Sequence, residues 1–377
     1  MMSSTTLMVT ASALVGAALA EDRSLATLPF ALQLIATMVT TIPASLLMGK
    51  IGRKAGFLFA TVIGMAGGVL AVEAILNHSF WHFCMATMLI GSFNAFGNYY
   101  RFAASENVDE AHRARAISYV MAGGVIAAFV GPNLANYGQY LIGDTRFAGS
   151  FLFVILLYAL SMLLLSFARL DPLTLDHPSE GGRRLRTILQ QPRTQVAIFC
   201  AMLGYGVMTL VMTATPLAME HHQHHFSDTA FVIQWHVLGM FLPSFFTGHL
   251  IHRFGVSRIL WSGAILAAIT LTINLLGTSF SHFLIALILL GVSWNFLFIG
   301  GTTLLTETYQ PEERAKVQAV NDFLVFTTNA IASLSAGYLI HQLGWWWVNI
   351  MVIPMVALMV MVLLRMERLP PSATDLR

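Results

Sequence analysis

The sequence predicts an all-α polytopic membrane protein built from two related six-helix halves, with a short first helix. Hydrophobic residues make up 56% of the 377 residues and charged residues 10%, against about 25% charged residues in soluble domains. The mean hydropathy is +0.71. At about 20 apolar residues per span, the chain holds about twelve membrane helices. Its apolar runs leave no room for a soluble domain.

Motifs of the first half return in the second half about 200 residues later. The loop S-L-L-M-G-K-I-G-R-K at 45–54 is matched by G-H-L-I-H-R-F-G-V-S-R at 248–258. The segment L-I-G-S-F-N-A-F around Gly91 is matched by L-L-G-V-S-W-N-F around Gly291. An acidic residue seven positions before an Arg-Ala pair also recurs. The offset is 203 residues for the loop, 200 for the segment around Gly91 and 201 for the acidic residue. Anchors in register indicate a duplicated chain, which is common among secondary transporters.

The loop at 45–54 resembles the signature loop of the major facilitator superfamily, roughly G-x-L-x-D-R-x-G-R-K. The resemblance extends over nearly the whole chain, because the repeat and the helix count also fit a bacterial-type twelve-helix permease. Two positions depart from the pattern, since Ser45 replaces its first Gly and Gly49 replaces its Asp. The second copy keeps Gly248 but has His252 in place of the Asp. In the family that Asp helps to lock the cytoplasmic gate, so the usual lock is altered here.

The resemblance implies a cytoplasmic gate at these loops and at the start of the eleventh expected helix, at about 317–340. The candidate gate residues are Lys50, Gly52, Arg53, Lys54, His252, Arg253, Gly255, Arg258 and Asp322. Asp322 is the carboxylate clearly inside a helix on the cytoplasmic side. Paired with Lys50 or Arg53 it would latch the gate, and unpaired it would carry a proton. We favour the latch.

Charge distribution sets the expected topology. All of the 20 Lys and Arg residues except Arg23, Arg101 and Arg146 fall in cytoplasmic segments if both termini lie inside, which is 17 of 20. This bias predicts a multi-pass protein of the plasma membrane, the inner membrane in a bacterium, with both termini cytoplasmic. The expected parts are the N-terminal half, the cytoplasmic linker, the C-terminal half and the cytoplasmic tail, at 1–168, 169–193, 194–366 and 367–377.

The first helix, expected at 1–20, has no basic flank before it. A cleaved signal peptide is therefore disfavoured. We expect related chains to begin upstream of Met1.

Ionisable groups inside the membrane are costly and often functional. The candidates for proton coupling are Arg101, His236 and Asp322. Arg101 resembles the family's helix-4 arginine, with only the Arg matching, and snorkelling to the cytoplasmic face is an equal alternative. His236 can carry a proton near physiological pH, and the alternative is a neutral histidine bonded to a neighbouring helix.

Polar side chains and helix breaks indicate a solute cavity, which the resemblance places between helices 1, 4, 7 and 10. The candidate lining residues are Asn94, Asn98, Tyr205, Thr209, Thr213, Trp294 and Asn295. Each alone is better explained by helix packing. Together, with no charge at mid-membrane, they suit a largely neutral, planar solute.

No cofactor is expected, and a metal site is only a weak alternative. His221, His224 and His225 would share one face if the segment E-H-H-Q-H-H is helical, and could then hold a transition metal. Polar filler in a loop is the favoured interpretation, because no array of ligands continues inward. Cys84 and Cys200 lie in apolar runs and indicate buried thiols.

These features predict a secondary active transporter of a small organic solute, driven by protons and working by alternating access. It would act as a monomer in the lipid bilayer, without nucleic acid. No ATP-binding loop is recognisable, and the chain is not expected to be an enzyme. A drug-type efflux antiporter remains the alternative within transport. A transport-inactive receptor or sensor on the same fold is the alternative outside it, and a membrane enzyme is weaker still.

Overall fold

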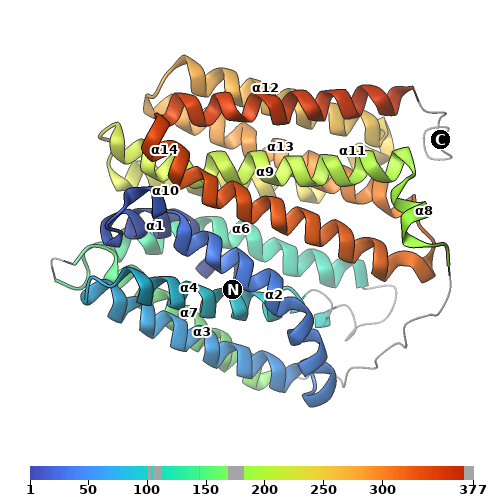
Figure 1. Ribbon diagram of the computed structural model, residues 1–377. Coiled ribbons are helices and arrows are strands. Elements are labelled where there is room, and N and C mark those ends of the chain that lie inside the picture. Colours follow the sequence, from blue (N-terminus) through green and yellow to red (C-terminus); the bar gives the residue numbers. More distant parts are fainter. Residues whose placement is uncertain (101–102, 105–112, 144, 169–181, 369–377) are drawn as a thin grey trace. The chain divides into compact units, whose positions relative to one another are not determined.

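The computed structural model describes the chain except for 101–102, 105–112, 144, 169–181 and 369–377. The described residues form helices and no strands (Figure 1), which confirms the all-α fold. The helices of the first half are α1 (Met2–Leu19), α2 (Leu28–Ile51), α3 (Arg53–Leu76), α4 (Phe80–Gly97), α6 (Arg113–Tyr137) and α7 (Ala148–Phe167). Those of the second half are α8 (Leu185–Leu189), α9 (Pro192–His221), α10 (Phe226–Phe241), α11 (Ser244–Phe254), α12 (Val256–Leu276), α13 (Phe280–Thr306) and α14 (Arg314–Glu367). Short 3₁₀ turns at Arg23–Leu25 and Pro311–Glu313 complete the list.

The pair α10 and α11, and the long helix α14, depart from simple straight helices. α10 and α11 are bent by 43° with respect to each other, although the sequence predicts one helix over 229–251. Pro243 lies at the bend, and a proline both lacks an N–H donor and clashes with the preceding turn. α14 is interrupted at Gly344, whose φ of 81° lies in the left-handed region. Counting the bent pair once and α14 twice, the described long helices provide the twelve segments that the sequence predicts.

Among the described residues, eight helices are long and apolar enough to cross a membrane, or nine with the bent pair. The fold is therefore that of a multi-pass membrane protein.

The chain forms two compact units that do not follow chain order alone. Unit 1 comprises Met1–Leu175, Thr213–Gln234 and Ser333–Gln342. Unit 2 comprises Asp176–Met212, Trp235–Ala332 and Leu343–Arg377. One end of α9, most of α10 and a short stretch of α14 thus belong with the helices of the first half. Each unit has its own apolar core.

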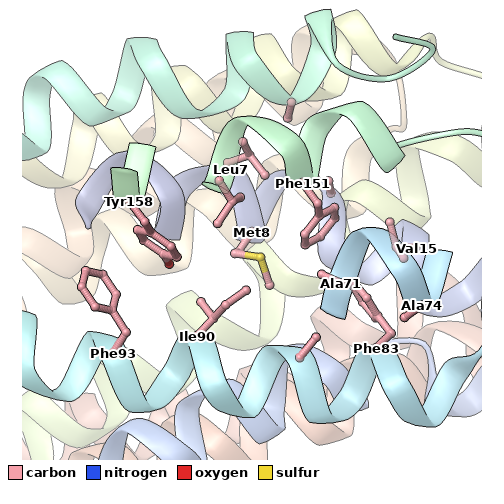
Figure 2. Close-up of a cluster of buried hydrophobic side chains, with 14 of the residues drawn as sticks. Leu7, Met8, Val15, Ala71, Ala74, Phe83, Ile90, Phe93, Phe151 and Tyr158 are labelled. Atoms are coloured by element: carbon pink, nitrogen blue, oxygen red, sulfur yellow. The ribbon is translucent and has the colours of Figure 1, made fainter. Parts of the chain in front are cut away.

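The core of unit 1 gathers around α1, which is enclosed by other helices. Figure 2 shows Leu7 and Met8 of α1 facing Phe83 and Ile90 of α4, with Tyr158 of α7 nearby. All five side chains are completely buried. Because α1 is buried along most of its length, polar residues such as its threonines must find partners inside the protein.

The core of unit 2 lies where α9, α12, α13 and the second part of α14 meet. Leu260, Leu297, Leu304 and Met359 are buried there. α12 and α13 approach closely at Gly263, where any side chain would press on Leu297.

The repeated glycines have equivalent roles in the two halves. Gly52 separates α2 from α3 with φ 85°, and Gly255 separates α11 from α12 with φ 83°, a conformation that glycine adopts without steric cost. A Cβ atom on Gly91 would overlap the backbone oxygen of Gln33 in α2. One on Gly291 would overlap the backbone oxygen of His236 in α10. Both glycines therefore allow a close helix crossing, and the predicted duplication appears in the backbone.

Candidate functional site

The three cations of the first signature loop differ in exposure and in their contacts. Lys50 is exposed and Arg53 is buried. Lys54 donates from Nζ to the backbone oxygen of Ser166 at 2.7 Å, so it joins the start of α3 to the end of α7. Lys54 therefore has a structural partner within unit 1.

The second signature loop closes α11. His252 and Arg253 are exposed in its last turn, and Arg258 is exposed in the first turn of α12. The guanidinium of Arg253 lies 5.3 Å from the ring centre of Phe254, a distance suited to a cation–π contact.

The proposed partner of these loops lies on α14. Asp322 is exposed and accepts a hydrogen bond from Asn321 Nδ2 at 3.1 Å. It belongs to unit 2, whereas Lys50 and Arg53 belong to unit 1. The latch therefore stays a prediction. Arg101 lies outside the described residues.

His236 is completely buried on α10. Its Nδ1 lies 2.7 Å from the backbone oxygen of Leu287, and since a carbonyl can only accept, Nδ1 carries the proton. In the described part of the chain, Nε2 is buried without a hydrogen-bond partner. The backbone at His236 also forms the crossing with Gly291, so this residue combines a packing position with a free imidazole nitrogen.

An aromatic cluster forms in unit 2 from Tyr205 of α9 and from Trp294 and Phe298 of α13. The rings of Trp294 and Phe298 are stacked, with centres 5.2 Å apart and planes 11° apart. The ring of Tyr205 meets both edge-on at 5.1 Å. Trp294 is only 6% exposed. A groove of about 220 Å³ begins at Phe298 and continues past Ile299 and the threonines of the last turns of α13.

Two other predicted cavity residues of unit 2 are engaged in internal hydrogen bonds. Thr209 donates to Asn329 Oδ1 between α9 and α14. Asn295 is completely buried. It donates to the backbone oxygen of Met240 at 2.7 Å and accepts from Thr247 at 2.7 Å. Asn295 thus supports the bend between α10 and α11, which supplies a structural reason for its position.

The remaining predicted cavity residues lie in unit 1. Asn94 is buried on α4, and Asn98 is the half-buried residue that ends this helix. Thr213 is buried on α9. Within the described ranges, Asn94 Oδ1 and Thr213 Oγ1 are buried without a hydrogen-bond partner. Both can therefore offer polar atoms to another group.

The histidine loop does not form the single helix on which the metal alternative depends. α9 ends at His221, and Gln223 has φ 63° before α10 begins at Phe226. No group of three metal-ligating side chains is found among the described residues, so His221, His224 and His225 do not converge. Partial burial and the two neighbouring histidines at 221 and 224 lower the pKa of His222.

An end cluster within unit 1 joins helices of the first half to the ends of α9 and α10. It consists of Arg146, Phe147, Glu220 and Phe226. Arg146 forms an ion pair with Glu220. The rings of Phe147 and Phe226 meet edge-on at 4.8 Å, and the Arg146 guanidinium lies 4.7 Å from the centre of Phe147. Opposite charges and aromatic packing thus hold this end of unit 1 together.

Hydrogen bonds of Thr27, the residue before α2, join α2 to α14 within unit 1. Thr27 Oγ1 donates to the backbone oxygen of Ser333 at 2.7 Å. It also accepts from the backbone N–H of Gly337 at 3.0 Å. Gly337 lets these two segments approach closely, because a side chain at this position would meet Thr27.

A linker clamp lies in unit 2, where the segment before α8 meets the turn before α14. Glu313 accepts from Arg183 Nε at 2.9 Å, from Arg183 Nη2 at 2.7 Å and from the backbone N–H of Gln310 at 3.0 Å. The Glu313 side chain is 1% exposed. The hydrogen bonds from Arg183, and then that from Gln310, hold the pKa of Glu313 at about 2.

Three features of these sites are not among the predictions from the sequence. Phe298 stands four residues after Trp294 on one helix face, and that i, i+4 spacing could have identified it. Pro243 could have identified the break between α10 and α11. The pairing of Arg146 with Glu220 spans 74 residues, and nothing local in the sequence signals it.

The fold and the repeated loops define a duplicated, polytopic membrane carrier with polar and aromatic side chains inside its helices. The sequence profile of the Major Facilitator Superfamily matches residues 1–235 and 196–376. This chain belongs to that superfamily. It is a secondary transporter of a small solute and not an enzyme.

Similar proteins include two curated relatives and one solved structure. The chain is 41% identical over 364 residues to the riboflavin transporter RfnT of Brucella anthropi, covering 96% of this chain and 92% of the relative. It is 31% identical to the uncharacterized MFS-type transporter YddS of Bacillus subtilis, covering 86% and 80%. The fold resembles the xylose transporter XylE from E. coli in a partially occluded inward open conformation, with a TM-score of 0.70, 12% identity, and coverage of 99% and 95%.

Proposed function

We propose that the solute carried by this transporter is riboflavin or a close flavin analogue. The observation that carries the proposal is the aromatic cluster of unit 2, in a chain that aligns over nearly its whole length with a riboflavin transporter. Stacking of a planar heterocycle on an aromatic side chain contributes about 1–3 kcal/mol for nucleic-acid bases. The flat ring system of a flavin is suited to the same contact.

The geometry of the cluster supports a flat ligand in particular. Trp294 is buried and stacked beneath Phe298, and Tyr205 holds both rings edge-on. This support fixes the plane of Phe298, which lines the groove. A rigid ring face binds a planar solute with little loss of side-chain freedom.

The proposed setting is the plasma membrane, the inner membrane in a bacterium, with both termini cytoplasmic. The bias of 17 of 20 Lys and Arg residues supports this orientation. The end cluster would then lie at the outer face. We take the two six-helix halves, at 1–168 and 194–366, as the bodies that move in alternating access, and the active form as a monomer.

Protons are the proposed driving ion. His236 supports this proposal because it is buried and has a nitrogen without a partner in the described part of the protein. Arg101 and Asp322 are the other candidates. In the same scheme Asp322 supplies the counter-charge that the signature loop lacks at Gly49, and pairs with Lys50 or Arg53 when the cytoplasmic gate closes.

Growth of a riboflavin auxotroph that lacks its own transporter tests the proposal. Expression of this chain should restore growth at low external riboflavin and raise uptake of labelled riboflavin, and excess unlabelled riboflavin but not xylose should compete. A Trp294→Ala chain, expressed at the same level, should restore little growth. If the chain reaches the membrane and neither uptake nor efflux of labelled riboflavin differs from the empty vector, the proposal is wrong.

A further inference from the structure

Four side chains on α13 follow one another at intervals of four residues. They are Trp294, Phe298, Thr302 and Thr306, and this spacing places successive side chains above one another on a helix. The first two are aromatic and the last two carry hydroxyl groups. The stripe therefore changes along its length from a flat apolar surface to a hydrogen-bonding one.

The hydroxyl half of the stripe lies in the groove that begins at Phe298. We call this the threonine groove, and its lining residues are Phe298, Ile299, Thr302, Thr303 and Thr306. Its volume of about 220 Å³ is below the 300–1,000 Å³ typical of whole ligand pockets. It therefore suits one part of a solute. The lining residues carry no charge, so the groove offers no cation for a phosphate.

The hydroxyl groups of the groove have hydrogen-bonding capacity to spare. Thr302 Oγ1 is buried and has no partner among the described residues. Thr306 Oγ1 donates to the backbone oxygen of Thr303 at 2.7 Å, which leaves its oxygen able to accept. A hydroxyl has one donor and two acceptor positions, and buried polar groups are normally paired. A hydroxylated ligand would complete this set.

Packing within unit 2 does not account for the groove. α13 approaches α9 through Gly301, where a side chain would meet the backbone of Ala197. It approaches α12 through Gly300, where a side chain would meet Leu260. At about 100° per residue, Thr302 and Thr306 point away from both contacts. The groove is thus on a side of α13 that these two helices leave open.

We infer that the threonine groove binds the linear polyhydroxylated side chain of the flavin, while Phe298, backed by Trp294 and Tyr205, stacks on its ring system. The inference rests on the proposed function and adds an orientation to it. Riboflavin combines a flat tricyclic ring with a ribityl chain, and its two parts match the two halves of the stripe. Lumiflavin, which has a methyl group in place of the ribityl chain, matches only the aromatic half. The phosphate of flavin mononucleotide finds no cation among the residues of the groove.

Binding to the purified full-length protein in nanodiscs tests the inference, with quenching of flavin fluorescence as the readout. The variant Thr302→Val keeps the shape of the side chain and removes its hydroxyl. We expect it to weaken riboflavin binding about tenfold, the effect of losing one hydrogen bond to a bound ligand, and to leave lumiflavin binding unchanged. The matched control is Thr272→Val on α12, whose exposed hydroxyl donates to the backbone oxygen of Ala268 in its own helix. That control should bind both flavins like the parent.

The outcomes separate the inference from the proposed function. Equal weakening of riboflavin and lumiflavin by Thr302→Val, or no weakening of either, would overturn the groove assignment while riboflavin transport stands. Tight binding of flavin mononucleotide by the parent would also overturn it. If the parent protein is folded by its thermal transition and binds no flavin, the proposed function fails, and the assignment fails with it.

Discussion

Loosening the end cluster should shift the protein toward a state that is open at that end. The side chains of Arg146 and Glu220 are 36% and 44% exposed, so their ion pair contributes only about 0.2–1 kcal/mol. The contact of Arg146 with Phe147 adds about 0.5–1 kcal/mol. Arg146→Ala removes both and should change the ratio of closed to open molecules about three- to thirty-fold. Glu220→Gln removes only the ion pair and should change it less than about fivefold.

A reporter cysteine on α9 can measure this shift. Thr213 is 3% exposed and lies seven residues before Glu220, which is about two turns deeper on the same face of the helix. In a chain with Cys84 and Cys200 replaced by Ala, Thr213→Cys would be labelled by a membrane-impermeant maleimide only when the end cluster opens. The labelling rate should rise by the factors above, first for Glu220→Gln and further for Arg146→Ala.

A double-mutant cycle then isolates the ion pair. Combining Arg146→Ala with Glu220→Gln should add little to Arg146→Ala alone, because the pair is already broken. If Arg146→Ala is labelled at the parent's rate, or if the two changes act independently, the end cluster does not control opening. A lower labelling rate in more salt would also contradict it, since salt weakens exposed ion pairs.

Three further predictions concern other contacts. Asn295→Leu should lower the free energy of unfolding by about 2–4 kcal/mol, measured in denaturant, because it removes several buried hydrogen bonds; unchanged stability would contradict its role at the bend. Glu313→Gln should speed tryptic cleavage of the linker while exposed Glu312→Gln does not. Since the folded pKa of Glu313, about 2, lies below its ordinary value of 4.5, the stabilisation by Glu313 should be present above about pH 4.5 and lost as the pH falls toward 2. The difference in thermal stability between the parent and Glu313→Gln should therefore disappear over that range, and a difference that persists would argue against the clamp. Asp322→Asn should favour the inward-open state and slow transport, and Gly49→Asp should restore part of the rate; a loss confined to proton coupling would instead make Asp322 a proton carrier.

Most of the fold can be predicted from the sequence because short stretches of sequence determine the helices and the repeat. Apolar runs of membrane-spanning length predict the helices, and the repeated Gly91 and Gly291 predict the duplication. Gly52 and Gly255 have nearly the same φ because each links two consecutive helices through the same positive-φ conformation. The break between α10 and α11 is hard to predict because the apolar run continues through Pro243, although the proline itself removes a hydrogen bond from the helix.

The candidate site is less accessible to sequence reasoning because it depends on contacts between distant helices. Residue type alone indicates Tyr205 and Trp294 as candidates, and only the structure adds Phe298 and shows the three rings in contact. Asn295 looked the same as Asn94 in sequence, yet it is committed to the bend between α10 and α11. Residue type predicts what a side chain can bind, and packing decides whether it is free to do so.

Counterflow in proteoliposomes tests directly whether this protein carries riboflavin. Vesicles that contain the purified protein and unlabelled riboflavin are diluted into a trace of labelled riboflavin. A riboflavin transporter should produce a transient, saturable accumulation of label that is absent from protein-free vesicles and strongly reduced by Phe298→Ala. Folded protein that produces no accumulation above protein-free vesicles, with riboflavin on either side, would contradict it.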